Sequence, residues 1–376
     1  MRLSDIRKQL TKNGYLPNDE VYSFDASYTD QTLELLAFSE EISNQPTITE
    51  FTKVDLTGGQ EIEGAKMQIL DQEGKVVEEW VSKKEAHVVY ALAPGEYILH
   101  EEQAPTEQGY VRAEDVKFVV EETGDVQKVK MEDDHTKVSI SKTDITDGKE
   151  IEGAKLQILD QDGEVVESWT TGEEHLIEYL PVGTYTLHEE AAVDGYIVAN
   201  DVEFTVEETG EIQKVKMEDE RAMGQLVIVK TDTDSKAALE GVEFVLLEKE
   251  TGKEVGRLKT GKDGKAVSEL LPIGTYENGV FKEPITYVLK ETATLKGYEK
   301  TEEEWEIVFT YQNDKTPVIE VVKEIQNKKI PETPGTVKPG PKTGDDTNWF
   351  LPLLALGVSA GMVAGLLYYR KRHKKA

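Results

Sequence analysis

Apolar and polar residues alternate in short runs along most of the chain, and this pattern predicts β-strands. In "YTLHE", residues 185–189, every second side chain faces the same side of the strand. Such runs are rich in Val, Ile, Tyr and Thr, and turn signals such as "QDGE", "ETGE" and "PVGTY" separate them. Short strands punctuated by turns predict an all-β fold of β-sandwich domains.

This strand pattern is repeated along the chain. The stretch "DITDGKEIEGAKLQILDQDGEVVESW" at 144–169 nearly restates "DLTGGQEIEGAKMQILDQEGKVVEEW" at 55–80, and a divergent third copy opens with "LVIVKTDTDSK". Copies of this length suit separate domains joined end to end better than a solenoid. The predicted domains are residues 47–134, 135–222 and 223–329, called here the first, second and third repeat.

The N-terminal segment resembles part of a repeat. Four Gly-Tyr pairs mark the copies, and "EEISNQP" places Asn44 where "KEIQNKK" of the third repeat places Asn327. Residues 1–46 are therefore predicted to be the C-terminal half of a further domain. It would carry no cross-link, since neither a first-strand Lys nor a core-facing Glu precedes Asn44. No apolar run of a signal peptide follows Met1, so we expect that Met1 is not the natural start.

The C-terminal region departs from the strand pattern. Residues 330–348 contain four prolines and no apolar periodicity, which predicts an extended linker. Residues 349–369 carry no charge, and as a helix they would span about 31 Å, enough for a hydrocarbon core of ~30 Å. The basic residues 370–376 predict a cytoplasmic tail after one transmembrane helix, so that residues 1–348 would lie outside.

Charged or amide side chains occupy core-facing positions at three places in each repeat. In "VSISK", for example, Lys142 shares its parity with the apolar Val138 and Ile140, and in "YTLHE" Glu189 shares its parity with Leu187. The last strands follow the same rule. The residues concerned are Lys53, Lys142 and Lys230 on the first strands; Glu101, Glu189 and Glu291 in the middle; and Asp133, Asp219 and Asn327 on the last strands.

Three interpretations of these residues stay open at this point. The strand parity fails at strand ends and all three side chains are solvated, or a buried Lys–Glu pair lies beside a strand-ending Asp. The third interpretation is chemical. An apolar site favours a neutral Lys, which is a nucleophile, and a protonated Glu, which can shuttle protons. The Lys amine would then attack the Asp or Asn carbonyl and form an isopeptide bond, with loss of water or ammonia.

Composition excludes several classes of function. The formal net charge of −31 argues against nucleic acid as a partner, because a phosphate backbone requires basic surface. The chain has no cysteine, which excludes disulfides and thiol-bound zinc. No metal site, cofactor site or enzymatic active site is predicted from its motifs.

The repeats closely resemble the Cna B-type, SpaA-like domains of Gram-positive surface proteins and pilins. The resemblance rests on "KTDITDGKEIEGAKLQILD" and "YTLHEEAAVDGY" and covers residues 51–329 and, less fully, 1–46. It implies a prealbumin-like sandwich and an autocatalytic bond between the first-strand Lys and the last-strand Asp or Asn. The Glu would be the catalyst. Asp in the first two repeats departs from the commoner Asn of the family.

A second resemblance concerns "PKTGD", residues Pro341, Lys342, Thr343, Gly344 and Asp345, followed by an apolar span and a basic tail. This order is similar to the LPxTG cell-wall sorting signal, although Gly340 stands where the family has Leu. It implies that sortase cuts after Thr343, in a membrane-spanning precursor, and joins Thr343 to an amine of peptidoglycan or of a pilus subunit.

Together these features predict an extracellular, cell-wall-anchored structural stalk or minor pilin-type protein rather than an enzyme. The alternative is an adhesin that binds a host matrix protein or glycan. Its binding face would lie on the third repeat, which carries the insertion "TYENGVFKEPITY" that the first two repeats lack.

Overall fold

The computed structural model describes residues 3–17, 28–29, 32–33 and 44–331 of the chain. The chain divides into two units, Met1–Lys329 and Ile330–Ala376, of which the first contains all three repeats. The predicted linker from residue 332 onward, sorting motif, apolar span and basic tail lie outside the described residues. Within the described part of the chain, no helix has the length and apolar character needed to cross a membrane.

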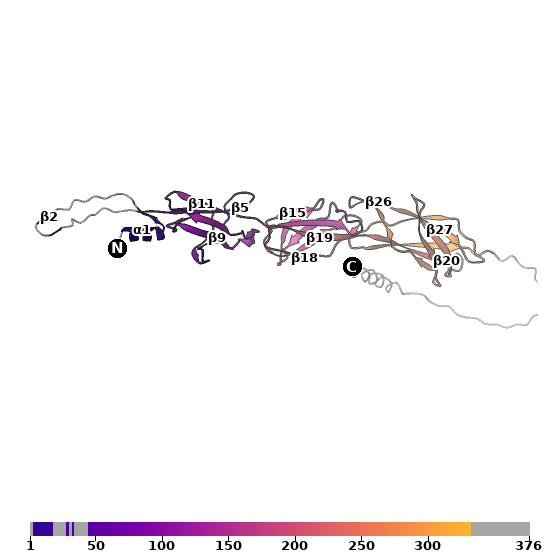
Figure 1. The fold of residues 1–376 in the computed structure, drawn as a ribbon. Coiled ribbons are helices and arrows are strands. Elements are labelled where there is room, and N and C mark those ends of the chain that lie inside the picture. Colours follow the sequence, from indigo (N-terminus) through magenta and orange to yellow (C-terminus); the bar gives the residue numbers. More distant parts are fainter. Residues whose placement is uncertain (1–2, 18–27, 30–31, 34–43, 332–376) are drawn as a thin grey trace, which may run out of the picture. The chain divides into compact units, whose positions relative to one another are not determined.

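The first repeat is a sandwich of two sheets (Figure 1). One sheet has the order β10-β9-β6-β7 and the other the order β11-β5-β8. Alternating apolar side chains such as Phe51, Met67 and Leu99 fill the space between them. The elements are β5 (Ile48–Asp55), β6 (Lys66–Leu70), β7 (Val76–Val81), β8 (His87–Tyr90), β9 (Gly95–Gln103), η1 (Thr106–Gln108), β10 (Val116–Val120) and β11 (Val126–Asp133).

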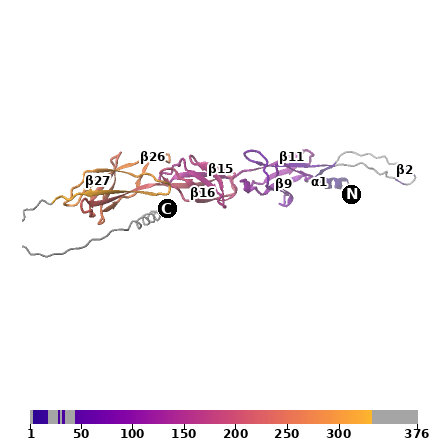
Figure 2. The ribbon, with the colours of Figure 1, turned by 180° about the vertical axis from the view of Figure 1, so that it is seen from behind.

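The second repeat has the same two layers, in the orders β14-β13-β16-β18 and β15-β12-β19-β17. Figure 2 shows this repeat from behind, with β15 and β16 both visible. Its core is separate from that of the first repeat and includes Val138, Leu156 and Leu187. The elements are β12 (Lys137–Asp144), β13 (Lys155–Leu159), β14 (Val165–Thr170), β15 (His175–Glu178), β16 (Gly183–Ala191), β17 (Tyr196–Ile197), β18 (Val202–Val206) and β19 (Ile212–Arg221).

The third repeat keeps the architecture and adds a hairpin. One sheet has the order β22-β21-β27-β28, and in the other β20 pairs with β23, β24 and β29. The predicted insertion forms the added hairpin, β25 (Gly274–Glu277) with β26 (Val280–Pro284). The remaining elements are β20 (Met223–Asp232), β21 (Glu243–Glu248), β22 (Glu254–Lys259), β23 (Lys265–Val267), β24 (Leu271–Pro272), β27 (Thr286–Ala293), β28 (Glu304–Val308) and β29 (Val318–Asn327).

The N-terminal segment includes a helix that the strand pattern does not predict. The helix α1 (Leu3–Lys12) has an acidic residue, Asp5, in its first turn and Lys12 in its last, which suits the helix dipole. It is followed by β1 (Tyr15–Leu16), β2 (Tyr28–Thr29), β3 (Thr32–Leu33) and β4 (Gln45–Pro46).

Each Gly-Tyr pair has the same place in the fold. The tyrosine pairs with the residue two positions beyond the predicted acceptor or its counterpart, as Tyr15 pairs with Pro46 and Tyr196 with Arg221. In the first three pairs the preceding glycine carbonyl accepts a hydrogen bond from a residue at the boundary with the next repeat. For example, the Ala222 N–H donates to the Gly195 carbonyl over 2.8 Å.

The insertion of the third repeat packs on the second repeat. The Tyr276 hydroxyl donates to the Gly195 carbonyl over 2.8 Å, and the Arg221 guanidinium lies 4.1 Å from the centre of the Tyr276 ring. A Cβ atom on Gly279 would lie 2.2 Å from the Glu150 carbonyl oxygen. The tip of this hairpin is therefore an interdomain contact.

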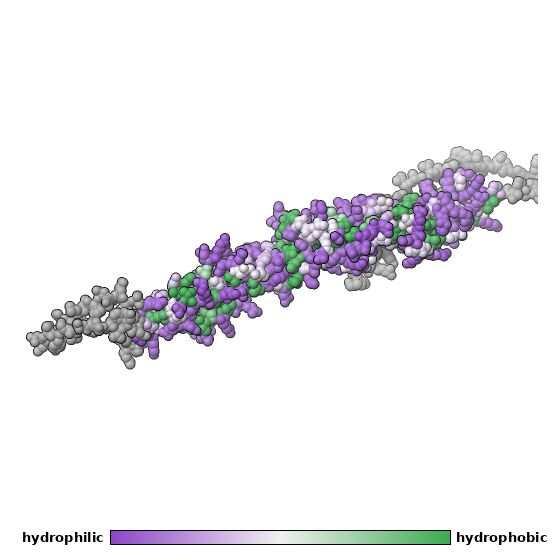
Figure 3. Space-filling model, turned by 90° about the horizontal axis from the view of Figure 1, so that it is seen from above, coloured by the Kyte–Doolittle hydropathy of each residue, from purple (hydrophilic) through white to green (hydrophobic). Residues whose placement is uncertain are grey.

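The surface is mostly hydrophilic on the face that Figure 3 shows, with small apolar areas between charged ones. Exposed valines such as Val76, Val81 and Val165 are among the apolar residues at the surface. A surface of this kind agrees with the strongly acidic composition.

Candidate functional site

The second repeat brings its three predicted polar residues into contact. Lys142 comes from β12, Glu189 from β16 and Asp219 from β19, and all three side chains are almost fully buried. The Lys142 Nζ atom lies 2.9 Å from Glu189 Oε2 and also contacts Asp219 Oδ1. The Ala199 N–H donates to the same Glu189 oxygen over 2.6 Å, which fixes the carboxylate in place.

The first repeat repeats this arrangement. Lys53 Nζ lies 2.9 Å from Glu101 Oε2 and contacts Asp133 Oδ1, and the three side chains are at most 4% exposed. The Ala113 N–H donates to Glu101 Oε2 over 2.8 Å. The two Asp-containing sites therefore have the same geometry.

In the third repeat the acceptor is an amide, and each of its polar atoms has a hydrogen-bond partner. Lys230 Nζ lies 2.9 Å from Glu291 Oε2 and donates to Asn327 Oδ1 over 2.5 Å. The Asn327 Nδ2 amide donates to Glu291 Oε1 and to Thr294 Oγ1, each over 2.7 Å.

The strand topology explains why these residues meet. The first and last strands of each repeat lie side by side and are parallel, so their C-terminal ends lie at the same edge. In the second repeat, Lys142 pairs in register with Met217, and Asp219 pairs with Asp144 two positions further on. The Glu reaches the same point from the opposite sheet. The structure thus brings together all nine residues that the strand parity singled out.

Charge balance indicates how the two Asp-containing sites are protonated. A lysine ammonium and one carboxylate cancel, but a second buried carboxylate would leave an uncompensated charge. The pKa of Asp219 is raised to about 7, because burial and the Glu189 carboxylate raise it by more than the Lys142 ammonium lowers it. The same causes raise the pKa of Asp133 to about 7.

A proton on the aspartate would also give hydrogen-bond partners to the buried carboxylate oxygens that lack them. Glu189 Oε1 and Asp219 Oδ2 are buried and have no hydrogen-bond partner among the described atoms, and neither do Glu101 Oε1 and Asp133 Oδ2. If the Asp carries a proton, it can donate to the Glu, as the Asn327 amide does in the third repeat. Each of these sites then holds a neutral acceptor, a lysine and a glutamate with zero net charge.

Burial lowers the pKa of Lys230, while the Glu291 carboxylate opposes this shift. A lower pKa increases the fraction of neutral amine, which is the nucleophilic form.

Sequence reasoning missed a second glutamate near the lysine in the first two repeats. Glu61 Oε2 accepts the backbone N–H of Lys53 over 3.0 Å, and Glu150 Oε2 accepts that of Lys142 over 3.1 Å. In the third repeat the Lys230 N–H donates instead to the Gly264 carbonyl over 2.8 Å. The repeated "EIEG" motif was the available signal for this residue.

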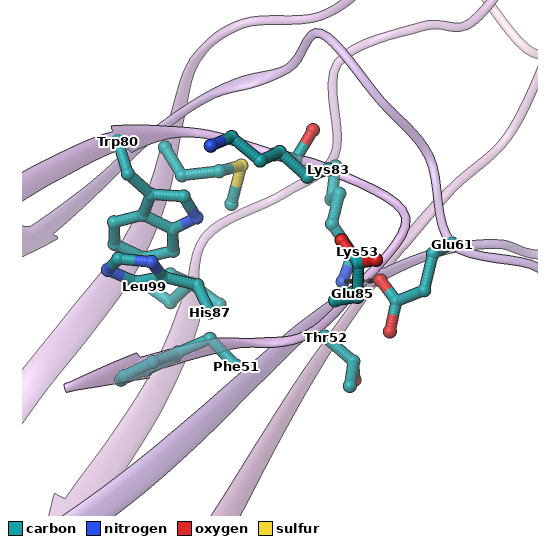
Figure 4. A pocket seen from close by; sticks show the side chains of 11 residues that line it. Phe51, Thr52, Lys53, Glu61, Trp80, Lys83, Glu85, His87 and Leu99 are labelled. Carbon is teal, nitrogen blue, oxygen red and sulfur yellow. Dashed lines mark hydrogen bonds between the residues drawn. The ribbon is translucent and has the colours of Figure 1, made fainter.

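Figure 4 shows Glu61 turned toward Lys53 at the wall of a small cavity in the first repeat. The cavity has a volume of about 10 Å³, and Trp80, His87 and Ser82 also line it. This volume is near the lower limit for one water molecule.

Other predicted sites cannot be located in the same way. Pro341, Lys342, Thr343, Gly344 and Asp345 lie outside the described residues. No group of three acidic or histidine side chains within the described ranges lies close enough to hold a metal ion.

The fold and the triads define a class of protein: tandem β-sandwich domains, each with a buried lysine in contact with a glutamate and an acceptor. A family model for the SpaA prealbumin-like fold domain matches residues 47–135, 136–221 and 224–284. The chain therefore belongs to the family of proteins with SpaA prealbumin-like domains.

Solved structures similar to the chain include one above a TM-score of 0.5. A structure of the Bacillus anthracis TIE protein is 28% identical, with a TM-score of 0.51, over 75% of this chain and 51% of that one. The chain thus spans about half the length of that structure. The major pilin subunit BcpA of Bacillus cereus is 16% identical over 75% of this chain and 99% of the pilin, at a TM-score of 0.41. No curated protein sequence matches the chain.

Proposed function

We propose that this chain is a cell-wall-anchored stalk or minor pilin-type surface protein whose repeats are locked by internal isopeptide bonds. One observation carries the proposal: every repeat buries a Lys–Glu–Asp or Lys–Glu–Asn triad with the lysine nitrogen in contact with the acceptor oxygen. Bond formation removes the buried charges.

The reaction balances without a cofactor. The Lys142 ammonium passes a proton to the Glu189 carboxylate, and the neutral amine attacks the carbonyl carbon of protonated Asp219. The Asp hydroxyl leaves as water with a proton from the amine, and Glu189 remains protonated. In the third repeat the Asn327 amide leaves as ammonia by the same route. Contact between the reacting groups supplies much of the rate.

The bond would stabilise each repeat against unfolding and against tension. It joins a point near the start of the repeat to one near its end, so a pulling force passes through the cross-link. By the loop-entropy argument used for disulfides, closing a loop of this size contributes roughly 4–5 kcal/mol.

The mass of the whole chain tests the bonds. Intact protein is expected to be lighter than its sequence by two waters and one ammonia, and tryptic digestion should yield one cross-linked peptide pair per repeat. Glu189→Ala should restore one water and leave the other two bonds in place. A full sequence mass for the unaltered protein, measured in freshly purified material, would refute the proposal.

Anchoring is a separate part of the proposal and rests on the order of PKTGD, apolar span and basic tail. Sortase would cleave after Thr343 and join it to an amine of peptidoglycan or of a pilus subunit. Thr343→Ala is expected to leave the protein in the membrane fraction, whereas the unaltered protein fractionates with the cell wall. Equal wall attachment of both would mean that another signal anchors the chain.

A second candidate function is ligand binding beside the insertion. Val280 and Phe281 of the hairpin line a groove of about 470 Å³ together with Val193, Asp194 and Lys155 of the second repeat. Grooves of this size bind small ligands or peptide side chains in other proteins. Binding of the full chain to matrix proteins or glycans, lost on Phe281→Ala, would favour an adhesin over a stalk.

A further inference from the structure

The proposed reaction takes place at the very end of a strand pair. In the second repeat, Asp144 with Asp219 is the last register pair between β12 and β19. The same is true of Asp55 with Asp133 and of Asp232 with Asn327. Strand ends fray more readily than strand centres, because a terminal pair has neighbours on one side only. A site that needs its reacting atoms in contact therefore needs something to hold this end closed.

Tyr196 is placed to do this. Its backbone pairs with Arg221, two residues beyond the acceptor Asp219 on β19. Its hydroxyl donates over 2.7 Å to Oδ2 of Asp144, two residues beyond Lys142 on β12. One residue thus connects, through its hydroxyl and its backbone, the strand that carries the nucleophile with the strand that carries the acceptor.

The surroundings of this contact strengthen it. Arg221 Nε donates to the same Asp144 oxygen over 2.5 Å, and the Ile145 N–H donates to the Asp219 carbonyl over 3.1 Å. Burial alone would raise the pKa of Asp144, but hydrogen bonds from Tyr196, Thr146 and Arg221 lower it, so the carboxylate stays ionised. Tyr196 itself is fully buried.

The other repeats have the same parts. The Tyr298 hydroxyl is one of the groups that lower the pKa of Asp232, after the stronger hydrogen bonds from Ser235. Burial and the Asp55 carboxylate raise the pKa of Tyr110 to about 12. Tyr110 and Tyr298 also form bridges with His135 and Lys329, each two residues beyond the acceptor.

We propose that Tyr196 is a positioning residue for the isopeptide reaction, and that its hydrogen bond to Asp144 keeps Asp219 in register with Lys142. This inference assigns a role to the Gly-Tyr pairs and rests on the proposed function. The tyrosine touches neither reacting atom and transfers no proton.

The test follows bond formation over time in the full chain, made by cell-free synthesis and stopped with acid. Tryptic mapping then gives the fraction of each cross-linked pair. Tyr196→Phe keeps the ring and removes the hydroxyl, and it is expected to slow the Lys142–Asp219 bond about tenfold. The Lys53–Asp133 and Lys230–Asn327 bonds should keep their rates and serve as internal controls.

Tyr185→Phe is the matched control. The Tyr185 hydroxyl is in the same repeat and donates to the Pro181 carbonyl over 2.9 Å, away from the reacting pair. Loss of that hydrogen bond should leave all three rates unchanged. The pH profile of the slowed reaction should keep the shape of the unaltered one, because a positioning residue does not titrate in the reaction.

The outcomes separate the two proposals. If the unaltered chain forms no bond, the proposed function fails. If the bond forms but Tyr196→Phe and Tyr185→Phe react equally fast, or if the pH profile changes shape, the inference about Tyr196 is overturned. Should Tyr196→Phe fail to fold, Asp144→Asn replaces it, because it weakens the same contact from the other side; an unchanged rate in that variant overturns the inference as well.

Discussion

The third repeat and the first two bury the same lysine and glutamate but complete the site with different acceptors. In the third repeat, the Asn327 amide gives a hydrogen to Glu291 and its oxygen faces Lys230. In the first two, an aspartate can fill both roles only if it carries a proton. The proposed reaction requires a neutral acceptor, which an amide provides at any pH and an acid provides only below its pKa.

The same repeats differ in how they contact their neighbours. The hairpin of β25 and β26, present only in the third repeat, packs Tyr276 and Gly279 on the second repeat. The second repeat contacts the first without such a hairpin: Tyr179, which has a positive φ, packs on Gly109 and donates to Asp55, and the Val182 N–H donates to the Thr106 carbonyl. The insertion thus adds a hairpin to one junction.

The largest expected effect concerns pH. The folded protein holds the proton on Asp219 with a pKa of about 7, well above the ordinary value of 3.8. The stabilisation that the folded protein gains from protonated Asp219 is complete below pH 3.8, the ordinary pKa, and is lost as the pH rises through about 7. The rate of the Lys142–Asp219 bond should therefore fall about tenfold per pH unit above 7, or roughly 100-fold by pH 9.

Over the same range the Lys230–Asn327 bond should change little, which makes the third repeat an internal control. Asp219→Asn should remove the decline in the second repeat and replace the lost water by ammonia. Mass spectrometry of each cross-linked peptide pair measures both effects. Equal pH dependence for Asp and Asn repeats would contradict the protonation argument.

A smaller effect is expected at the junction that only the third repeat enlarges. Gly279 has a φ of 68° and no room for a Cβ atom, so Gly279→Ala adds a clash with Glu150 to backbone strain. We expect a loss of about 2–3 kcal/mol of stability and faster proteolysis between the second and third repeats.

Gly252→Ala is the control for this variant, because Gly252 has a φ of 66° and open space around it. It should cost about 1 kcal/mol. Chemical denaturation followed by tryptophan fluorescence compares the two variants. If they lose the same stability, the hairpin does not brace the junction.

Strand alternation predicted the triad residues, because a charged residue at a core-facing position of a strand has few structural explanations. It singled out Lys53, Glu101 and Asp133 and their counterparts before any contact was known. The position of a residue in the alternation indicates which face of the sheet its side chain occupies. A site between two facing sheets is built from side chains on their inward faces, so alternation can identify its residues. The all-β sandwich architecture followed from the same pattern and is confirmed by the family match.

Other features depend on contacts between distant segments, which periodicity does not report. The insertion was predicted only as the place of a binding face on the third repeat, yet it packs on the second repeat, where the Tyr276 hydroxyl donates to the Gly195 carbonyl. The helix α1 was missed, since its short amphipathic run lies in a segment assigned to strands by similarity alone. The Gly-Tyr pairs were visible as markers, but their link to Asp144 needs the register of β17 and β19.

The smallest expected effect concerns one hydroxyl group that the third repeat has and the first two lack. Thr294 Oγ1 accepts a hydrogen bond from the Asn327 amide over 2.7 Å, whereas Ala104 and Ala192 stand three residues after their glutamates in the other repeats. A protonated aspartate has one hydrogen to donate, and the glutamate accepts it. An amide has two hydrogens and therefore needs a second hydrogen-bond acceptor. Thr294→Val leaves one amide hydrogen of Asn327 without an acceptor in a buried site, which costs about 1 kcal/mol and should slow formation of the Lys230–Asn327 bond roughly fivefold.

Thr292→Val, at an exposed neighbouring position, is the control and should have no effect on the rate of the Lys230–Asn327 bond. If Asn327→Asp is combined with Thr294→Val, the second substitution should no longer matter, because the acid does not use the hydroxyl; a fivefold effect that persists in the double variant would show that Thr294 acts through packing instead.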